Sequence, residues 1–151
     1  REGGSRGAGR RLLDPAAAKA ARVEAYEAKM AMLKSAEVVC ATCIGIGSEL
    51  LARVPFRAVL MDEATQATEA STLVGLCRSA QQVVLVGDQC QLPPTVRTAA
   101  GGTPEARPLF NRLLDDGLTT SLLATQYRMH PALAQLPSDL FYAGGLDDGV
   151  E

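Results

Sequence analysis

Two apolar runs in this chain are each followed by acidic residues. Residues 58–61 precede Asp62 and Glu63, and residues 83–87 precede Asp88. Ligands of open parallel sheets bind beyond the carboxyl ends of the strands. Acids at those ends can hold a metal ion and activate a water molecule, whereas acids on helix faces are merely solvated. The spacing therefore predicts a site for nucleotide hydrolysis at one edge of a parallel sheet.

Asp62 and Glu63 suit two different tasks in such a site. Magnesium prefers carboxylate and water oxygens, and phosphoryl transfer needs an acid near the attacking water. Because the chain leaves the strand at this point, Asp62 can face the metal while Glu63 faces the water. The alternative is that both residues cap the following helix.

The acids need strands and helices to position them. Apolar β-type runs at 37–43, 57–62, 82–87 and 119–125 alternate with helical patterns near 67–78 and 107–116. This alternation predicts a parallel α/β sheet with helices over both faces. The crossover rule for parallel strands then brings their carboxyl ends to one edge. The residues expected to converge there are Asp62, Glu63, Asp88 and Gln91.

The N-terminal part of the chain differs from the remainder in charge and composition. Residues 1–34 carry eight basic and four acidic side chains, against seven and thirteen in the remainder. We expect a flexible basic lead over 1–13, and then a helix with Asp14 as N-cap that runs to about Lys34. The basic residues either contact nucleic acid phosphates or form a solvated helix face. An apolar stripe on that helix is expected to pack in the core, and consists of Val23, Tyr26, Met30 and Leu33.

Composition places further bounds on the chain. With 151 residues, 47% hydrophobic and 21% charged, it has the makings of a soluble globular domain with one core. No apolar run approaches the roughly 20 residues that cross a bilayer, so we expect no membrane partner and an intracellular protein, cytoplasmic or nuclear. The first residue is not methionine, and we interpret the chain as a fragment.

Four cysteines are too few for a disulfide framework in a chain of this length. Cys40 and Cys43 have a metal-like or redox-like spacing, but no second close pair completes a zinc site. We therefore expect buried structural thiols, with zinc or redox chemistry as the alternatives.

Three segments of the chain stand in order at spacings that resemble successive motifs of superfamily 1 helicases. They are Asp62-Glu63-Ala64-Thr65-Gln66-Ala67, Gly87-Asp88-Gln89-Cys90-Gln91-Leu92-Pro93-Pro94 and Gln126-Tyr127-Arg128-Met129-His130-Pro131. Residues 39–43 and the pair Phe141-Tyr142 extend the resemblance to the group of the nonsense-mediated-decay RNA helicase. The likeness covers roughly residues 35–151. It implies a RecA-like fold of the P-loop NTPase class, in which residues 14–125 end a first helicase domain and residues 126–151 begin a second.

The resemblance also implies cofactors and roles. The cofactors would be ATP and Mg²⁺, with Asp62 binding the metal through water and Glu63 acting as the catalytic base. Gln91 would sense the γ-phosphate, and Arg128 would stabilise the transferring phosphate, because a planar guanidinium can bridge two of its oxygens. Tyr127 would either stack on adenine or pack at the domain junction.

The resemblance says less about four other features. Thr42 and Pro93 would contact the backbone of single-stranded RNA or DNA, and proteins of an mRNA decay machinery are possible partners. His130 precedes a proline, and we expect it to be a hydrogen-bonded turn residue rather than a general base.

The phosphate-binding loop of such enzymes, G-x-x-x-x-G-K-[ST], does not occur in these residues. The lysines are Lys19, Lys29 and Lys34, and each follows alanine or leucine rather than glycine. We therefore expect a helicase motor fragment that is inactive alone but belongs to an ATP-hydrolysing parent. The alternatives are a non-catalytic module that binds nucleic acid or protein, and an Asp-Glu ATPase that does not separate strands.

Overall fold

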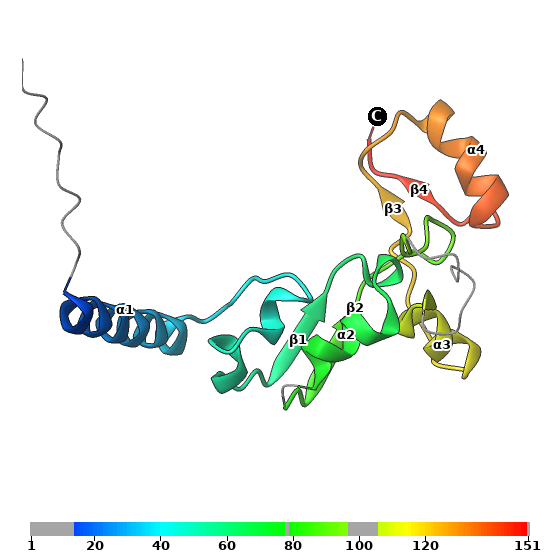
Figure 1. Cartoon of the computed structure of the whole chain (residues 1–151). Coiled ribbons are helices and arrows are strands. Elements are labelled where there is room, and N and C mark those ends of the chain that lie inside the picture. The colour runs from blue at the N-terminus through cyan, green and yellow to red at the C-terminus, as the bar shows by residue number, and fades with distance from the viewer. Residues whose placement is uncertain (1–13, 78, 97–105, 151) are drawn as a thin grey trace, which may run out of the picture. The chain divides into compact units, whose positions relative to one another are not determined.

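The computed structural model describes residues 14–77, 79–96 and 106–150 (Figure 1). It divides into two compact units between Val54 and Pro55, which are described separately below. The expected flexible lead over 1–13 lies outside the described residues. Among the described helices, none is both long and apolar enough to cross a membrane.

The first unit is dominated by helix α1, Pro15–Ser35. As predicted, the Asp14 side chain accepts a hydrogen bond from the Ala16 N–H at 3.1 Å, and Pro15 occupies the first turn, where its missing N–H costs nothing. The expectation that the apolar stripe of this helix packs in the core is wrong, because no side chain of α1 is buried and Val23 is 50% exposed. No described element of this unit covers that face.

Two short 3-10 turns complete the first unit, η1 at Gly45–Gly47 and η2 at Leu51–Arg53. The strand predicted over 37–43 does not form, and this segment is irregular. A strand needs a neighbour to take its backbone hydrogen bonds, and the described part of this unit contains none. The prediction identified an extended, apolar segment but gave it the wrong secondary structure.

The second unit contains two parallel strands joined by a helix. β1 (Ala58–Met61) pairs with β2 (Gln82–Leu85) so that Ala58 lies opposite Gln82 and Met61 opposite Leu85. α2 (Glu69–Leu76) forms the crossover between them (Figure 1). The predicted α/β class and parallel pairing are confirmed. The cover over the strands is less complete than predicted, since Leu60 is 70% exposed.

The buried core of this unit gathers at the carboxyl end of β1. Helix α3 (Leu109–Asp115) contacts both α2 and the 3-10 turn η3, Ala64–Gln66, that follows β1. The Arg112 guanidinium joins α3 to α2 by two hydrogen bonds, of 3.0 and 2.8 Å, to the Glu69 carboxylate. The side chains buried in and around this region are Met61, Ala64, Thr65, Thr72 and Leu109. The loop that carries Asp62 and Glu63 is thus supported by the packing of α3 against η3.

A second, smaller β-α-β arrangement ends the unit. β3 (Thr125–Gln126) pairs in parallel with β4 (Asp147–Asp148), and α4 (Pro131–Phe141) lies between them in the sequence (Figure 1). Of the strand predicted over 119–125, only Thr125 is paired. The domain boundary predicted between residues 125 and 126 lies within β3 and stays a prediction.

Candidate functional site

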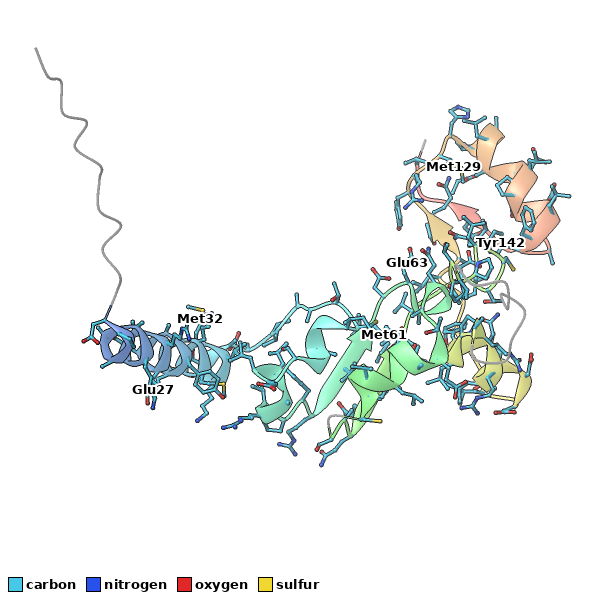
Figure 2. The ribbon with its side chains drawn as sticks, viewed as in Figure 1. Glu27, Met32, Met61, Glu63, Met129 and Tyr142 are labelled. Carbon is cyan, nitrogen blue, oxygen red and sulfur yellow. The ribbon has the colours of Figure 1, made fainter. Side chains whose placement is uncertain are left out.

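The chain turns sharply directly after β1. Glu63 adopts the left-handed conformation, with φ 52° and ψ 40°, which costs a residue with a Cβ of the order of 1 kcal/mol. Asp62 stabilises the turn by accepting the Glu63 N–H at 3.0 Å through Oδ1. Both side chains are exposed, and Figure 2 shows Glu63 just beyond the end of β1. Strain of this kind is typical of functional positions.

Glu63 does not cap the turn that follows it. Its side chain accepts no backbone N–H of η3, and its Oε2 instead accepts a hydrogen bond from Gln66 Nε2 at 3.0 Å. The alternative of helix capping therefore fails for Glu63. The carboxylate is anchored on one oxygen and open to solvent, which suits a group that must take a proton from water.

The loops after β1 and β2 touch each other. The ladder continues past the strands, as Val86 donates to the Met61 carbonyl and accepts from the Ala64 N–H, both at 2.8 Å. Thr65, only 2% exposed, accepts the Asp88 N–H through Oγ1 at 3.3 Å. A Cβ at Gly87 would lie 3.0 Å from the Thr65 backbone nitrogen, so a side chain at this position would push the two loops slightly apart.

Asp88 gathers three donors on its carboxylate. Oδ1 accepts the Cys90 N–H at 2.9 Å, and Oδ2 accepts both Gln91 Nε2, at 2.6 Å, and the Tyr142 hydroxyl. Partial burial opposes ionisation of Asp88, but the hydrogen bonds from Tyr142, Gln91 and Cys90 outweigh it and hold the pKa of Asp88 below its usual range. The same bond to Asp88, with burial and the negative charge, raises the pKa of Tyr142. Asp88 is therefore an ionised anchor for its loop.

The structure thus places the predicted acids and Gln91 on one edge of the sheet. Asp62 and Glu63 follow β1, while Asp88 and Gln91 follow its parallel neighbour β2. The Thr65 bridge ties the two loops together. This convergence is as predicted from the sequence, and the catalytic and ligand roles of these residues stay predictions.

Gln126 organises the arginine-bearing segment. Its Oε1 accepts the N–H groups of Arg128 and Met129 at 2.9 and 2.7 Å, and its Nε2 donates to the Met129 carbonyl and Asp148 Oδ1, both at 2.7 Å. This side chain therefore fixes the turn that presents Tyr127 and Arg128. Figure 2 shows Met129 at that turn.

Arg128 and Tyr127 are both exposed, with Tyr127 at 73%. Within the described ranges, the Arg128 guanidinium makes no hydrogen bond or ion pair, and nothing joins it to Glu63 or Gln91. The Tyr127 ring lies against Gly149, where an added Cβ would overlap it. The structure therefore leaves both side chains available to a ligand and leaves the two interpretations of Tyr127 open.

His130 has the structural role predicted for it. It is the N-cap of α4, and its Nδ1 accepts the Ala132 N–H at 3.2 Å, with Pro131 in the first turn. This satisfies one of the free N–H groups at the start of the helix. The predicted hydrogen-bonded turn residue is confirmed, and the expectation that His130 is not a general base stays a prediction.

The two residues predicted to meet nucleic acid lie in different units. Thr42, in the first unit, accepts the Gly45 N–H through Oγ1 at 2.9 Å and thereby shapes the turn into η1. Pro93, in the second, is exposed after the Asp88 loop. Both roles stay predictions.

The cysteines differ from what was expected. Cys40, Cys77 and Cys90 are exposed and Cys43 is half-buried, so the expectation of buried structural thiols is wrong. The physical reason is that Cys40 lies in an irregular segment and Cys77 and Cys90 lie at a helix end and in a turn, where little packs over them. In the described part of the chain, no three His, Cys, Asp or Glu residues cluster as a metal site.

Asp62 remains a suitable ligand for a divalent ion. One of its carboxylate oxygens binds the Glu63 N–H, and the other makes no hydrogen bond with the described residues. Magnesium keeps several waters and commonly takes only one or two carboxylates together with substrate phosphates. The donor set at the end of β1 therefore fits Mg²⁺ that arrives with a nucleotide.

Sequence reasoning missed the residues that hold the site together. Thr65, Gln126 and Asp148 act through hydrogen bonds to residues far from them in the sequence, which a linear pattern does not reveal. Tyr142 was noted as part of a pattern without a role. Because no helix was predicted over 131–141, nothing in the sequence pattern indicated that Tyr142 follows a helix end and contacts Asp88.

Comparison with known proteins agrees with this geometry. Two models, each described as an AAA domain, match residues 9–99 and 106–151. The "Regulator of nonsense transcripts 1 homolog" of Drosophila melanogaster is 44% identical over 79% of this chain and 10% of its own length, and that of Arabidopsis thaliana is 48% identical over 78% and 9%. The "ATP-dependent helicase upf1" of Schizosaccharomyces pombe is 42% identical over 87% and 14%. The chain thus spans roughly a tenth of these relatives. It belongs to the AAA domain family and, within it, to the superfamily 1 helicases of the nonsense-mediated-decay RNA helicase group.

Proposed function

We propose that this chain forms the hydrolytic edge of an ATP-dependent helicase motor that moves along single-stranded RNA or DNA. The observation that carries the proposal is the parallel register of β1 and β2, which sets Asp62 and Glu63 beside the Asp88–Gln91 loop. The names of the curated relatives, which include an ATP-dependent helicase, support the use of ATP. Motion would come from closure of two RecA-like lobes around the nucleotide.

Glu63 is the proposed base. Its exposed carboxylate is steadied by Gln66 and can accept a proton from water as that water attacks the γ-phosphate. Asp62 would hold Mg²⁺, which supplies charge neutralisation on the phosphate oxygens when bound. The left-handed turn at Glu63 gives these neighbouring acids different backbone settings, in keeping with two separate tasks.

Gln91 and Arg128 are the proposed contacts to the transferring phosphate. The side-chain amide of Gln91 lies at the carboxyl edge of the sheet and donates a hydrogen bond to the Asp88 carboxylate. The Arg128 guanidinium is exposed on a turn fixed by Gln126, so it is free to form a bidentate contact with phosphate oxygens. Tyr127 beside it would stack on the adenine or pack at the domain junction.

Thr42 and Pro93 are the proposed contacts to the nucleic acid backbone, a grip that is largely insensitive to base identity. The relatives' name, "Regulator of nonsense transcripts 1 homolog", supports partners in mRNA decay. We place the protein inside the cell, in the cytoplasm or nucleus. Three exposed free thiols support a reducing compartment, where disulfides are rare.

The test is Glu63→Gln in the full-length protein, with ATP turnover measured in the presence and absence of single-stranded RNA. Glutamine keeps the size of the side chain and its contact with Gln66 but cannot take the proton. We expect turnover to fall about 10²- to 10⁴-fold while ATP affinity stays within a few fold. The matched control is Glu49→Gln, the same charge change at an exposed residue of the first unit. Equal turnover in Glu63→Gln and wild type would overturn the assignment, and a wild type without turnover would favour a non-catalytic module.

A further inference from the structure

The Asp88 loop receives two contacts from the end of α4. The Tyr142 hydroxyl donates to Asp88 Oδ2, and the Cys90 thiol lies 3.5 Å from the Phe141 carbonyl oxygen. Tyr142 is 54 residues from Asp88 in the sequence. Two consecutive residues at the end of α4, Phe141 and Tyr142, therefore contact two residues of the loop that carries Gln91. Figure 2 shows Tyr142 at this end of α4.

Tyr142 and Gln91 share a single carboxylate oxygen. Gln91 Nε2 lies 2.6 Å from Asp88 Oδ2, the same oxygen that accepts the Tyr142 hydroxyl, while Oδ1 is held by the Cys90 N–H. A carboxylate oxygen has two lone-pair sites, so the two donors fill Oδ2. The orientation of the Asp88 carboxylate, and with it the position of the Gln91 amide, depends on both.

We propose that Tyr142 is a positioning residue for Gln91, and that it couples the nucleotide-sensing loop to the β3–α4–β4 segment. This inference rests on the proposed role of Gln91 at the γ-phosphate. When Gln91 turns from Asp88 toward a phosphate, the Tyr142 hydroxyl keeps the carboxylate in place and the loop retains its shape. A movement of α4 would then reach Gln91 through Asp88.

The charge state of the pair supports a durable link. Hydrogen bonds to an ionised group are roughly twice as strong as neutral ones. The pKa of Asp88 is lowered and that of Tyr142 raised, and both shifts favour a neutral phenol on a charged carboxylate. The link is therefore present throughout the neutral range.

The test is Tyr142→Phe in the full-length protein. Phenylalanine keeps the ring and its edge-on contact with Phe141, whose centroid is 6.5 Å away, and removes only the hydroxyl. We expect kcat for ATP to fall about 5- to 20-fold, which is at or below the low end of the value of one hydrogen bond to a charged group because the hydroxyl acts on Gln91 indirectly, with KM changed less than 2-fold. The matched control is Tyr26→Phe in α1, which makes the same chemical change outside this loop and should leave kcat unchanged.

A double-mutant cycle separates positioning from general destabilisation. If Tyr142 acts through Gln91, adding Tyr142→Phe to Gln91→Ala should lower kcat by less than 2-fold further. The same 5- to 20-fold loss in both backgrounds would overturn the proposal, as would wild-type kcat in Tyr142→Phe. If Glu63→Gln loses turnover while Tyr142→Phe keeps the wild-type kcat, this inference alone is refuted. Unchanged turnover in Glu63→Gln would instead refute the proposed function.

The phenol itself provides a second readout. The alkaline ultraviolet difference spectrum of wild type minus Tyr142→Phe should show ionisation of Tyr142 above its ordinary pKa. In an Asp88→Asn background, the same difference spectrum should move to lower pH because the negative charge is gone. An identical transition in both backgrounds would show that Tyr142 does not contact Asp88 and would overturn the proposal.

Discussion

Gly87→Ala tests the close approach between the loop after β1 and the loop after β2. A methyl group at this position would lie 3.0 Å from both Thr65 Cγ2 and the Thr65 backbone nitrogen, and 3.2 Å from Thr65 Oγ1. Thr65 is 2% exposed and its neighbour Ala64 is 1% exposed, so neither can swing into solvent. The backbone of one loop must therefore move away from the other.

The expected cost follows from these contacts. Forcing an extra methyl group into a packed site typically costs 1–3 kcal/mol, and separating the loops also weakens the bond from the Asp88 N–H to Thr65. We expect the free energy of unfolding to fall by about 2 kcal/mol. Because Asp88 carries Gln91, the same shift should lower ATP turnover more than ATP affinity.

Chemical denaturation and ATP turnover of the full-length protein measure both effects. Thr65→Ser is the informative partner, because serine keeps the Oγ acceptor and removes the Cγ2 methyl group that clashes. In the double variant, we expect a recovery of about 0.5–1 kcal/mol, with the remainder lost to the clash at the backbone nitrogen. Wild-type stability of Gly87→Ala would refute the close approach, and no recovery with Thr65→Ser would refute the identity of the clashing group.

Two further predictions concern the scaffold. His130→Ala should lower the free energy of unfolding by about 0.5–2 kcal/mol because the Ala132 N–H loses its acceptor, whereas His130→Asn should retain most of the stability; equal losses in chemical denaturation of both variants would contradict the capping role. The hydrogen bond and the charge of Arg112, opposed by partial burial, lower the pKa of Glu69. This pair therefore stabilises the fold fully above the unfolded-state pKa of about 4.3, and the stabilisation is lost as the pH falls through the lower folded-state pKa. Glu69→Gln should therefore lower the melting temperature more at pH 7 than at pH 3, and a loss of the same size at both pH values would contradict this linkage.

The sequence was sufficient for the elements that carry the acids. Strands β1 and β2 and helices α2 and α3 lie within the predicted ranges, because apolar runs and helical spacing are local signals. The convergence of Asp62 and Asp88 followed from topology alone, since parallel neighbours share their carboxyl edge. These are the parts of the site that pattern and chirality determine.

The errors occur where structure depends on partners distant in the sequence. Residues 37–43 have the composition of a strand but have no neighbour in the described unit, and the apolar stripe of α1, including Val23, has no cover there. The thiol of Cys90 was expected in a core and lies exposed in a turn. Composition shows that a residue can be buried, whereas only tertiary contacts decide whether it is.

The three motifs combine two kinds of polar residue that a linear pattern cannot separate. Thr65, Gln126 and His130 use their polar atoms on backbone groups, Thr65 on the neighbouring Asp88 loop and the other two on their own turns, so their loss should cost stability. Glu63 and Arg128 leave charged atoms in solvent, so their loss should cost turnover and little stability. Gln91 belongs to both kinds, because its amide is exposed but bonded to Asp88. To contact a phosphate, the Gln91 amide would have to leave the Asp88 carboxylate. The Tyr142 hydroxyl would then hold that carboxylate in place.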